Sequence, residues 1–124
     1  MYRLEDTTEN RILIQDFINE TKRRLLNRVP ITFTHKASLE LQDLVLEFDI
    51  VPTDIEFVLM NLKTENYYRG IDTSRNNDFN VCAFCVEIRE SDIEIYLKFG
   101  LEVNGIQILV FSNHLPKYTV IKPF

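Results

Sequence analysis

The fold is decided by a stretch of alternating residues, Asp92-Ile93-Glu94-Ile95-Tyr96-Leu97-Lys98-Phe99-Gly100-Leu101-Glu102-Val103. Every odd position is apolar, whereas the even positions hold Asp, Glu, Tyr, Lys and Gly. Side chains of a β-strand point to alternate faces, so this segment has one apolar face and one mostly polar face. The pattern predicts a strand over 92–103 whose odd side is packed and whose other side carries Tyr96 and Lys98.

The alternating pattern extends to both sides of this stretch. Asn104-Gly105 is a strong signal for a hairpin turn, which predicts a partner strand over 106–113. A polar loop over 72–78 precedes a third β-like stretch over 79–89, and a last short strand is expected around 118–121. The three longer strands together predict an antiparallel meander.

The first 70 residues show helical spacing of apolar side chains instead. Thr7 and Thr8 offer N-caps for a first helix, and Thr53 offers a cap for a third. Gly70 is expected to close a short helical turn. The expected elements are helices over about 8–28, 38–48 and 53–62, and a short extended piece at 31–34.

These elements predict one α+β domain over 1–124, mostly helical over 1–70 and an antiparallel sheet over 71–124. The helices are expected to pack on one face of that sheet. With 124 residues, of which 45% are hydrophobic, the chain can bury a core without disulfides or metals.

The net charge of −5 argues against a protein whose whole surface binds nucleic acid. The charge is uneven, because 1–62 hold seven Lys/Arg against eleven Asp/Glu and 63–124 hold seven against eight. A local anion site is therefore expected in the second half. The apolar runs are too short to span a membrane and the N-terminus is too charged for a signal peptide, which predicts a cytoplasmic protein without a membrane partner.

Cys82-Ala83-Phe84-Cys85 matches the C-x-x-C pattern. Residues three apart in a strand point to opposite faces, and no second pair completes a zinc site, so neither a disulfide nor a metal is expected here. The sequence also lacks the short motifs of nucleotide-binding loops, zinc proteases and α/β-hydrolases.

The remaining polar groups are suited to handling a phosphate without a metal or another cofactor. RNA carries its own nucleophile, the 2′-hydroxyl, so a protein needs cations for the phosphorane charge and a side chain that exchanges protons. Lys and Arg supply the charge, and His exchanges protons near neutral pH. The candidate catalytic residues are Lys98, His114, Tyr96 and Arg69, and the candidate substrate contacts are Arg75, Asn113 and Asn80.

Four short motifs in order resemble the MqsR family of toxins, which is similar to the broader RelE-like nucleases. The motifs are Asn66-Tyr67-Tyr68-Arg69-Gly70, the strand opening Asp78-Phe79-Asn80-Val81-Cys82-Ala83-Phe84, then Glu94-Ile95-Tyr96-Leu97-Lys98, and Ile108-Leu109-Val110-Phe111-Ser112-Asn113-His114. The resemblance implies a small type II toxin that cleaves single-stranded mRNA without a metal and is neutralised by a cognate antitoxin protein. By motif position it places Tyr96 and Lys98 on an active-site strand, with Arg69 and His114 at basic positions.

The position of His114 depends on the register of the hairpin. With a two-residue turn at Asn104-Gly105, Tyr96 faces Asn113 and His114 lies on the packed face. With a three-residue loop, Tyr96 faces Ser112 and His114 joins the polar face. The first register buries the apolar residues better, and only the second, or a bulge near Ser112, assembles the site.

Two function classes fit these features: a ribonuclease toxin, and a non-catalytic protein-binding or regulatory module with a degenerate toxin fold. Convergence of Arg69, Lys98 and His114 around one cleft favours the nuclease. Acidic patches around that cleft favour the binding module.

Overall fold

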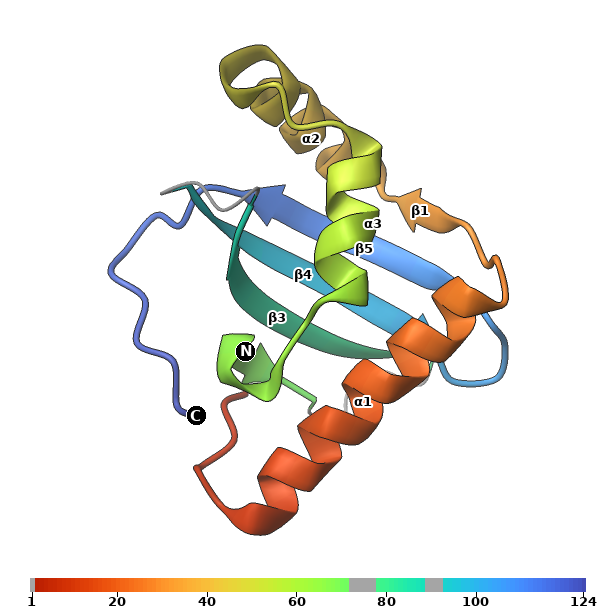
Figure 1. Ribbon diagram of the computed structural model, residues 1–124, viewed down its shortest axis with the longest axis vertical. Coiled ribbons are helices and arrows are strands. Elements are labelled where there is room, and N and C mark those ends of the chain that lie inside the picture. Colours follow the sequence, from red (N-terminus) through yellow and green to blue (C-terminus); the bar gives the residue numbers. More distant parts are fainter. Residues whose placement is uncertain (1, 72–77, 89–92) are drawn as a thin grey trace.

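The computed structural model describes residues 2–71, 78–88 and 93–124. Its elements follow in the order α1 (Thr8–Leu26), β1 (Ile31–Phe33), α2 (His35–Phe48), α3 (Pro52–Met60), the 3-10 helix η1 (Thr64–Asn66), β2 (Tyr67–Gly70), β3 (Phe79–Glu87), β4 (Glu94–Glu102) and β5 (Ile108–His114). The predicted α+β class, with helices before the main strands, is confirmed (Figure 1).

The strands form one sheet in the order β1-β5-β4-β3-β2. The predicted antiparallel meander is confirmed, because β3 pairs with β4 and β4 with β5 in antiparallel fashion. The prediction of a wholly antiparallel sheet is wrong at one edge, where β1 runs parallel to β5 with Thr32 opposite Leu109. The hydroxyl of Thr32 donates to the carbonyl of Ile108 at 2.9 Å, which helps hold the short extended piece on the sheet.

Three local predictions differ from the structure. The expected helical turn before Gly70 is the strand β2, held in place by the Tyr67 hydroxyl, which donates to the Gly70 carbonyl. The α3 helix starts at Pro52, and Asp54 rather than Thr53 accepts a hydrogen bond at its N-terminus, from the backbone of Val51. Residues 118–121 form no strand, and instead belong to a tail that runs back across the sheet.

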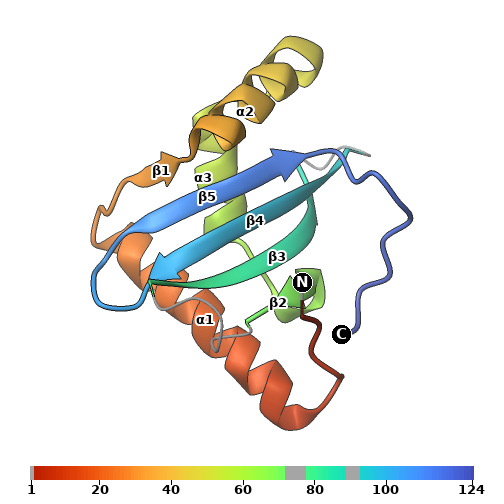
Figure 2. The ribbon, with the colours of Figure 1, turned by 180° about the vertical axis from the view of Figure 1, so that it is seen from behind.

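The helices α1 and α3 cover one face of the sheet, and α2 lies beside β5 (Figures 1 and 2). The odd residues of β4 pack on this face as the alternation predicted, and Ile95, Leu97 and Phe99 are fully buried. The ring of Phe99 lies 5.4 Å from that of Phe17 in α1 and 5.7 Å from that of Phe84 in β3. Burial of such apolar side chains is the main stabilising contribution to the fold.

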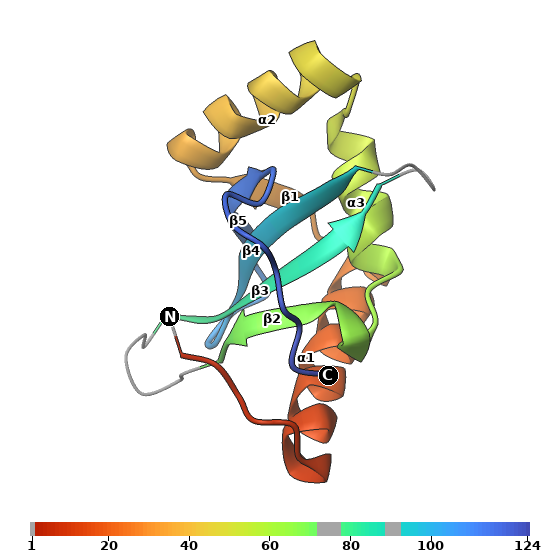
Figure 3. The same ribbon diagram turned by 90° about the vertical axis from the view of Figure 1, so that its left-hand side faces the viewer.

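The opposite face of the sheet is only partly covered. The tail after β5, residues 115–124, crosses this open face and returns toward β2 (Figure 3). Val120 of the tail packs against Ala83, Cys85 and Tyr96, and Phe124 stacks on Tyr67 with ring centroids 5.0 Å apart. No helix in the described ranges is long and apolar enough to cross a membrane.

Arg24 connects α1 to the β4–β5 hairpin although its side chain is buried. Its guanidinium donates to the carbonyls of Glu102 and Gln107, each at 2.9 Å, and to the Glu20 carboxylate at 2.8 Å. Basic residues are favourable in the last turn of a helix, and Arg24 additionally makes tertiary contacts there.

We expect Arg24→Leu to lower the free energy of unfolding by about 2–3 kcal/mol, because charge-assisted hydrogen bonds to two hairpin carbonyls are lost. Arg23→Leu is the matched control, since Arg23 pairs with the same Glu20 carboxylate from the exposed side of the helix. It should cost about 0–1 kcal/mol. Urea unfolding of both variants measures the difference, and equal losses would show that the hairpin contacts do not stabilise the fold.

The contacts of Glu20 with Arg23 and Arg24 also predict that the fold loses stability in acid. Hydrogen bonds from Arg23 and then Arg24, working against desolvation, lower the pKa of Glu20 from 4.5 to about 2. A carboxylate with a depressed folded pKa stabilises the fold above its ordinary pKa, and this stabilisation is lost as the pH falls from 4.5 toward 2. When unfolding curves are measured across this window, the free energy of unfolding should depend less on pH in Glu20→Gln than in the wild-type chain.

Candidate functional site

A β-bulge in β5 turns His114 onto the open face. Phe99 pairs with Val110 whereas Lys98 pairs with Ser112, so Phe111 is an extra residue between the two pairs. Between the turn and the bulge, β4 and β5 pair in the register of a two-residue turn. Beyond the bulge, toward His114, their pairing is shifted by one residue. The third possibility raised by the sequence, a bulge near Ser112, is confirmed.

Gly100 lies against the bulge on the neighbouring strand. A Cβ atom on Gly100 would lie 3.0 Å from the ring of Phe111 and 3.1 Å from the side chain of Phe79. The missing side chain leaves room for the Phe111 ring on the open face, where it packs edge-on against Phe79 with centroids 5.9 Å apart. The bulge lets apolar Ile108 and Val110 face the core while Ser112 and His114 face the other way.

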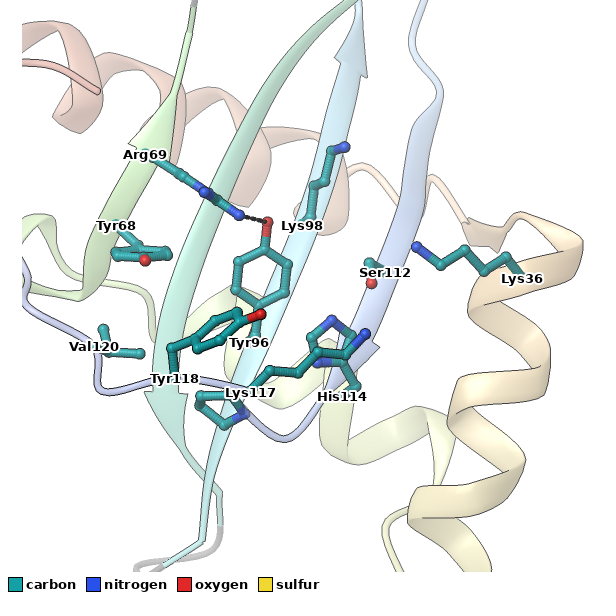
Figure 4. Close-up of a pocket in the computed structure, with 11 residues that line it drawn as sticks. Lys36, Tyr68, Arg69, Tyr96, Lys98, Ser112, His114, Lys117, Tyr118 and Val120 are labelled. Carbon is teal, nitrogen blue, oxygen red and sulfur yellow. Dashed lines mark hydrogen bonds between the residues drawn. The ribbon is translucent and has the colours of Figure 1, made fainter. Parts of the chain in front are cut away.

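The open face holds a pocket of about 290 Å³ above β2, β4 and β5, closed by α2 and the tail (Figure 4). Cations and aromatic rings dominate its lining, and no carboxylate belongs to it among the described residues. The lining residues are Lys36, Tyr68, Arg69, Tyr96, Lys98, Ser112, His114, Pro116, Lys117, Tyr118 and Val120.

The cations of this pocket are close enough to repel one another. Burial and the positive charges of Lys36 and Arg69 lower the pKa of Lys98 from its ordinary value. Within the described chain, Lys98 has no carboxylate partner, and its amino group lies 5.9 Å from the centroid of the Phe111 ring. An unpaired, half-buried ammonium next to other cations is suited to binding an anion.

Tyr96 lies at the centre of the pocket, between two neighbours. The imidazole of His114 stacks on its ring with centroids 4.9 Å apart and an angle of 17°. The guanidinium of Arg69 lies 5.7 Å from the centroid of the Tyr96 ring and donates to the phenol oxygen at 3.5 Å (Figure 4). The guanidinium and the imidazole are thereby both held against Tyr96.

The orientation of the His114 ring is fixed by the backbone that follows it. Its Nδ1 atom lies 2.6 Å from the carbonyl oxygen of Leu115, which can only accept, so Nδ1 carries a proton in this contact. The other nitrogen, Nε2, lies 3.9 Å from a carboxylate oxygen of Glu40 in α2. Nε2 is therefore the ring nitrogen that the backbone does not hold.

Glu40 also fixes the strand next to the pocket. Its carboxylate accepts hydrogen bonds from the Ser112 hydroxyl at 3.0 Å and from the Asn113 backbone at 3.2 Å. These bonds attach α2 to β5 on the outer side of the bulge. They place the positive side chain of Lys36, one turn earlier in α2, at the pocket rim.

The structure brings together the four residues predicted as catalytic, Arg69, Tyr96, Lys98 and His114. Lys98 and His114 are diagonal neighbours on adjacent strands and lie on the same face of the sheet. Figure 4 shows the Lys98 amino group extending away from the imidazole, so the two groups line different parts of the pocket.

Two of the three predicted substrate contacts are not in the pocket. Asn113 is fully buried, and its amide donates to the Ala37 carbonyl at 2.8 Å, so it joins β5 to α2. Asn80 pairs with Leu101 and therefore lies on the helix-covered side of the sheet. Arg75 lies outside the described residues.

Sequence reasoning missed several lining residues, chiefly Lys36, Lys117 and Tyr118. Lys36 is one residue past the start of α2, which begins three residues earlier than expected because Thr34 caps it. Lys117 and Tyr118 lie in the tail, for which no periodic pattern predicts a position. The basic and aromatic composition of 117–118 was the one available signal.

The two cysteines face opposite sides of the sheet as predicted, with Cys82 opposite core Phe99 and Cys85 opposite Tyr96. Both thiols are free and buried, and burial raises the pKa of Cys85 to about 11. The residues that the structure describes contain no group of three His, Cys, Asp or Glu side chains arranged to hold a metal ion.

Comparison with protein-family models, with curated proteins and with solved structures gives no match to this chain. The fold and site described above are therefore the basis for assigning a function.

Proposed function

We propose that this chain is a metal-independent endoribonuclease that cleaves single-stranded RNA through the RNA's own 2′-hydroxyl. The observation that carries the proposal is the pocket on the open face, where four basic side chains surround a Tyr96–His114 stack and no described carboxylate lines the wall. Such a wall favours a phosphodiester over a cation, and it supplies charge without a metal.

The residues divide the chemistry among them. Arg69 and the Tyr96 hydroxyl donate to non-bridging phosphate oxygens, and Lys98 stabilises the charge that develops on the phosphorane. The 2′-oxygen attacks phosphorus as its proton passes to solvent, and the bond from phosphorus to the 5′-oxygen breaks. As this bond breaks, His114 donates its Nε2 proton to the leaving 5′-oxygen, while the Leu115 carbonyl holds the Nδ1 proton in place.

The test is incubation of the purified chain with a long RNA in EDTA, followed by analysis of the new ends. The proposed chemistry gives a 2′,3′-cyclic phosphate and a 5′-hydroxyl, whereas a metal-dependent nuclease gives a 3′-hydroxyl and a 5′-phosphate and stops in EDTA. A matched oligonucleotide with 2′-deoxy sugars should bind and remain intact, because it lacks the nucleophile. Cleavage of that oligonucleotide, or no cleavage of RNA at all, would contradict the proposal.

We further propose that the nuclease is a cytoplasmic toxin of a type II toxin-antitoxin system in the MqsR family, held inactive by a cognate antitoxin protein. The support is the resemblance of four ordered motifs, of which the strands with Tyr96, Lys98 and His114 meet at one pocket. Strong induction of the chain in bacteria should stop growth, and induction of His114→Ala at equal soluble level should not. Unimpaired growth with the wild-type chain would count against this assignment.

A second candidate function, a non-catalytic protein-binding module, is favoured by a different surface. A groove of about 300 Å³ next to His114 is lined by the acidic residues Glu40, Asp43 and Glu47, with the apolar Leu44 and Phe48. Its charge is opposite to that of the phosphate pocket and suits a basic protein segment. Failure of RNA cleavage together with capture of a basic partner at this groove would make the binding module the better account.

A further inference from the structure

Tyr118 differs from the other aromatic residues that line the pocket. Its side chain is 85% exposed, whereas Tyr96 is 8% exposed. Figure 4 shows the Tyr118 ring reaching over the pocket from the tail, next to Lys117. The ring is not part of the core, so its surface is open to a ligand at the mouth of the basic pocket.

The ring of Tyr96 has little free surface for a ligand to stack on. His114 stacks on it at 4.9 Å, and on its other sides Tyr68 meets it edge-on at 6.1 Å and the Arg69 guanidinium lies 5.7 Å from its centroid. Tyr96 can therefore offer its hydroxyl to a phosphate. A planar ligand that enters the pocket must use a different ring.

The tail holds Tyr118 near the pocket because it is attached to the sheet beyond that residue. Val120 packs against the small cluster around Tyr96 on the open face, and the Lys122 amino group lies 3.8 Å from the Glu94 carboxylate. Arg3 donates to the Ile121 carbonyl. The backbone on one side of Tyr118 is thus fixed, and on the other side Pro116 lines the pocket itself.

We infer that Tyr118 is the stacking platform for a nucleobase of the single-stranded substrate whose phosphate enters the basic pocket, an inference that rests on the proposed function. Every base has a flat π-face, so stacking on Tyr118 accepts any base and selects for bases that are not already stacked in a duplex. Lys117, beside it in the chain, lines the same pocket, and its positive charge neutralises a phosphate of the substrate's backbone. The tail therefore confers selectivity for single strands and leaves the reacting groups to the sheet.

The test is fluorescence anisotropy with a labelled single-stranded oligonucleotide that has 2′-deoxy sugars, so that binding is measured without cleavage. Tyr118→Ala should weaken binding roughly tenfold, and Tyr118→Phe should retain the wild-type affinity because it keeps the ring. An all-abasic oligonucleotide of equal length and the matched duplex should bind the wild-type chain and Tyr118→Ala equally. Phe57→Ala is the matched control, since it removes an exposed ring from α3 on the covered side of the sheet.

The outcomes separate this inference from the proposed function. Ring-dependent binding of the oligonucleotide supports the platform even if the wild-type chain cleaves no RNA. Unchanged binding in Tyr118→Ala overturns the platform even if RNA is cleaved, and so does an equal loss on the abasic oligonucleotide. A Tyr118→Phe variant as weak as Tyr118→Ala would show that the hydroxyl rather than stacking binds the ligand, and would also overturn it.

Discussion

The His114→Ala variant is expected to cleave single-stranded RNA at least about 10²-fold more slowly than the wild-type chain, with most of the loss in kcat. The imidazole is the proposed general acid, and no other side chain in the described pocket lining exchanges a proton readily near neutral pH. Removing it leaves the 5′-oxygen to depart as an alkoxide. Initial rates on an RNA oligonucleotide with one cleavage site measure the change.

His35→Ala is the matched control for this prediction. His35 is the other histidine of the chain, it is exposed at the start of α2, and it does not line the pocket. Its loss should leave the cleavage rate unchanged. Both variants should melt within a few degrees of the wild-type chain, because neither imidazole belongs to the core. If His114→Ala cleaves at the wild-type rate, the assigned role of His114 is wrong.

Much of the sheet could be predicted from the sequence because local alternation and core burial agree there. The odd residues of β4 had to face the core, and this placed Tyr96 and Lys98 on the open face. The predicted strands over 79–89, 92–103 and 106–113 each differ from β3, β4 and β5 by two residues or fewer at each end. Where apolar and polar residues alternate regularly, the bounds of a strand can be predicted without knowing which strands lie beside it.

The facing of His114 could not be predicted in the same way. Strict alternation along β5 would put Ile108, Val110, Ser112 and His114 on one side, and the bulge at Phe111 divides them into two apolar and two polar residues. The bulged residue Phe111 packs where Gly100, in another strand, has no side chain. A single sequence read along the chain gives no direct sign of such a contact between strands, although a bulge near Ser112 was one of the two arrangements expected to assemble the site.

The remaining differences arise from contacts between segments far apart in the chain. β1 joins the sheet in parallel to β5, with Thr32 and Ile108 separated by 76 positions. Val120 holds the tail on the open face, and Phe124 at its end stacks on Tyr67 of the main core. Periodicity predicts elements and says little about which distant segments meet, so the pocket wall formed by α2 and the tail was missed.

The Lys98→Met variant is expected to lose roughly 10²-fold in kcat/KM while its fold becomes no less stable. Burial and the neighbouring charges of Lys36 and Arg69 disfavour the Lys98 ammonium and lower its pKa, so this charge opposes folding at neutral pH. This loss of folding free energy is fully present below the lowered pKa of Lys98, and it disappears as the pH rises toward 10.5, the ordinary pKa of a lysine. Methionine keeps the length of the side chain and removes the charge.

Two measurements distinguish a phosphate-binding Lys98 from a structural one. The thermal melt of Lys98→Met at neutral pH should equal or exceed that of the wild-type chain, whereas loss of a structural lysine would lower it. The dependence of oligonucleotide affinity on salt should also fall by about 0.7 in logarithmic slope, as expected when one phosphate contact to a single strand is lost. Lys63→Met, which removes an exposed lysine outside the pocket, should change neither quantity. If Lys98→Met melts at a lower temperature and its salt slope is unchanged, the lysine supports the sheet and does not bind the substrate. A lysine that contacts the substrate phosphate gives the opposite result, because its loss leaves the stability intact and lowers the salt dependence of binding.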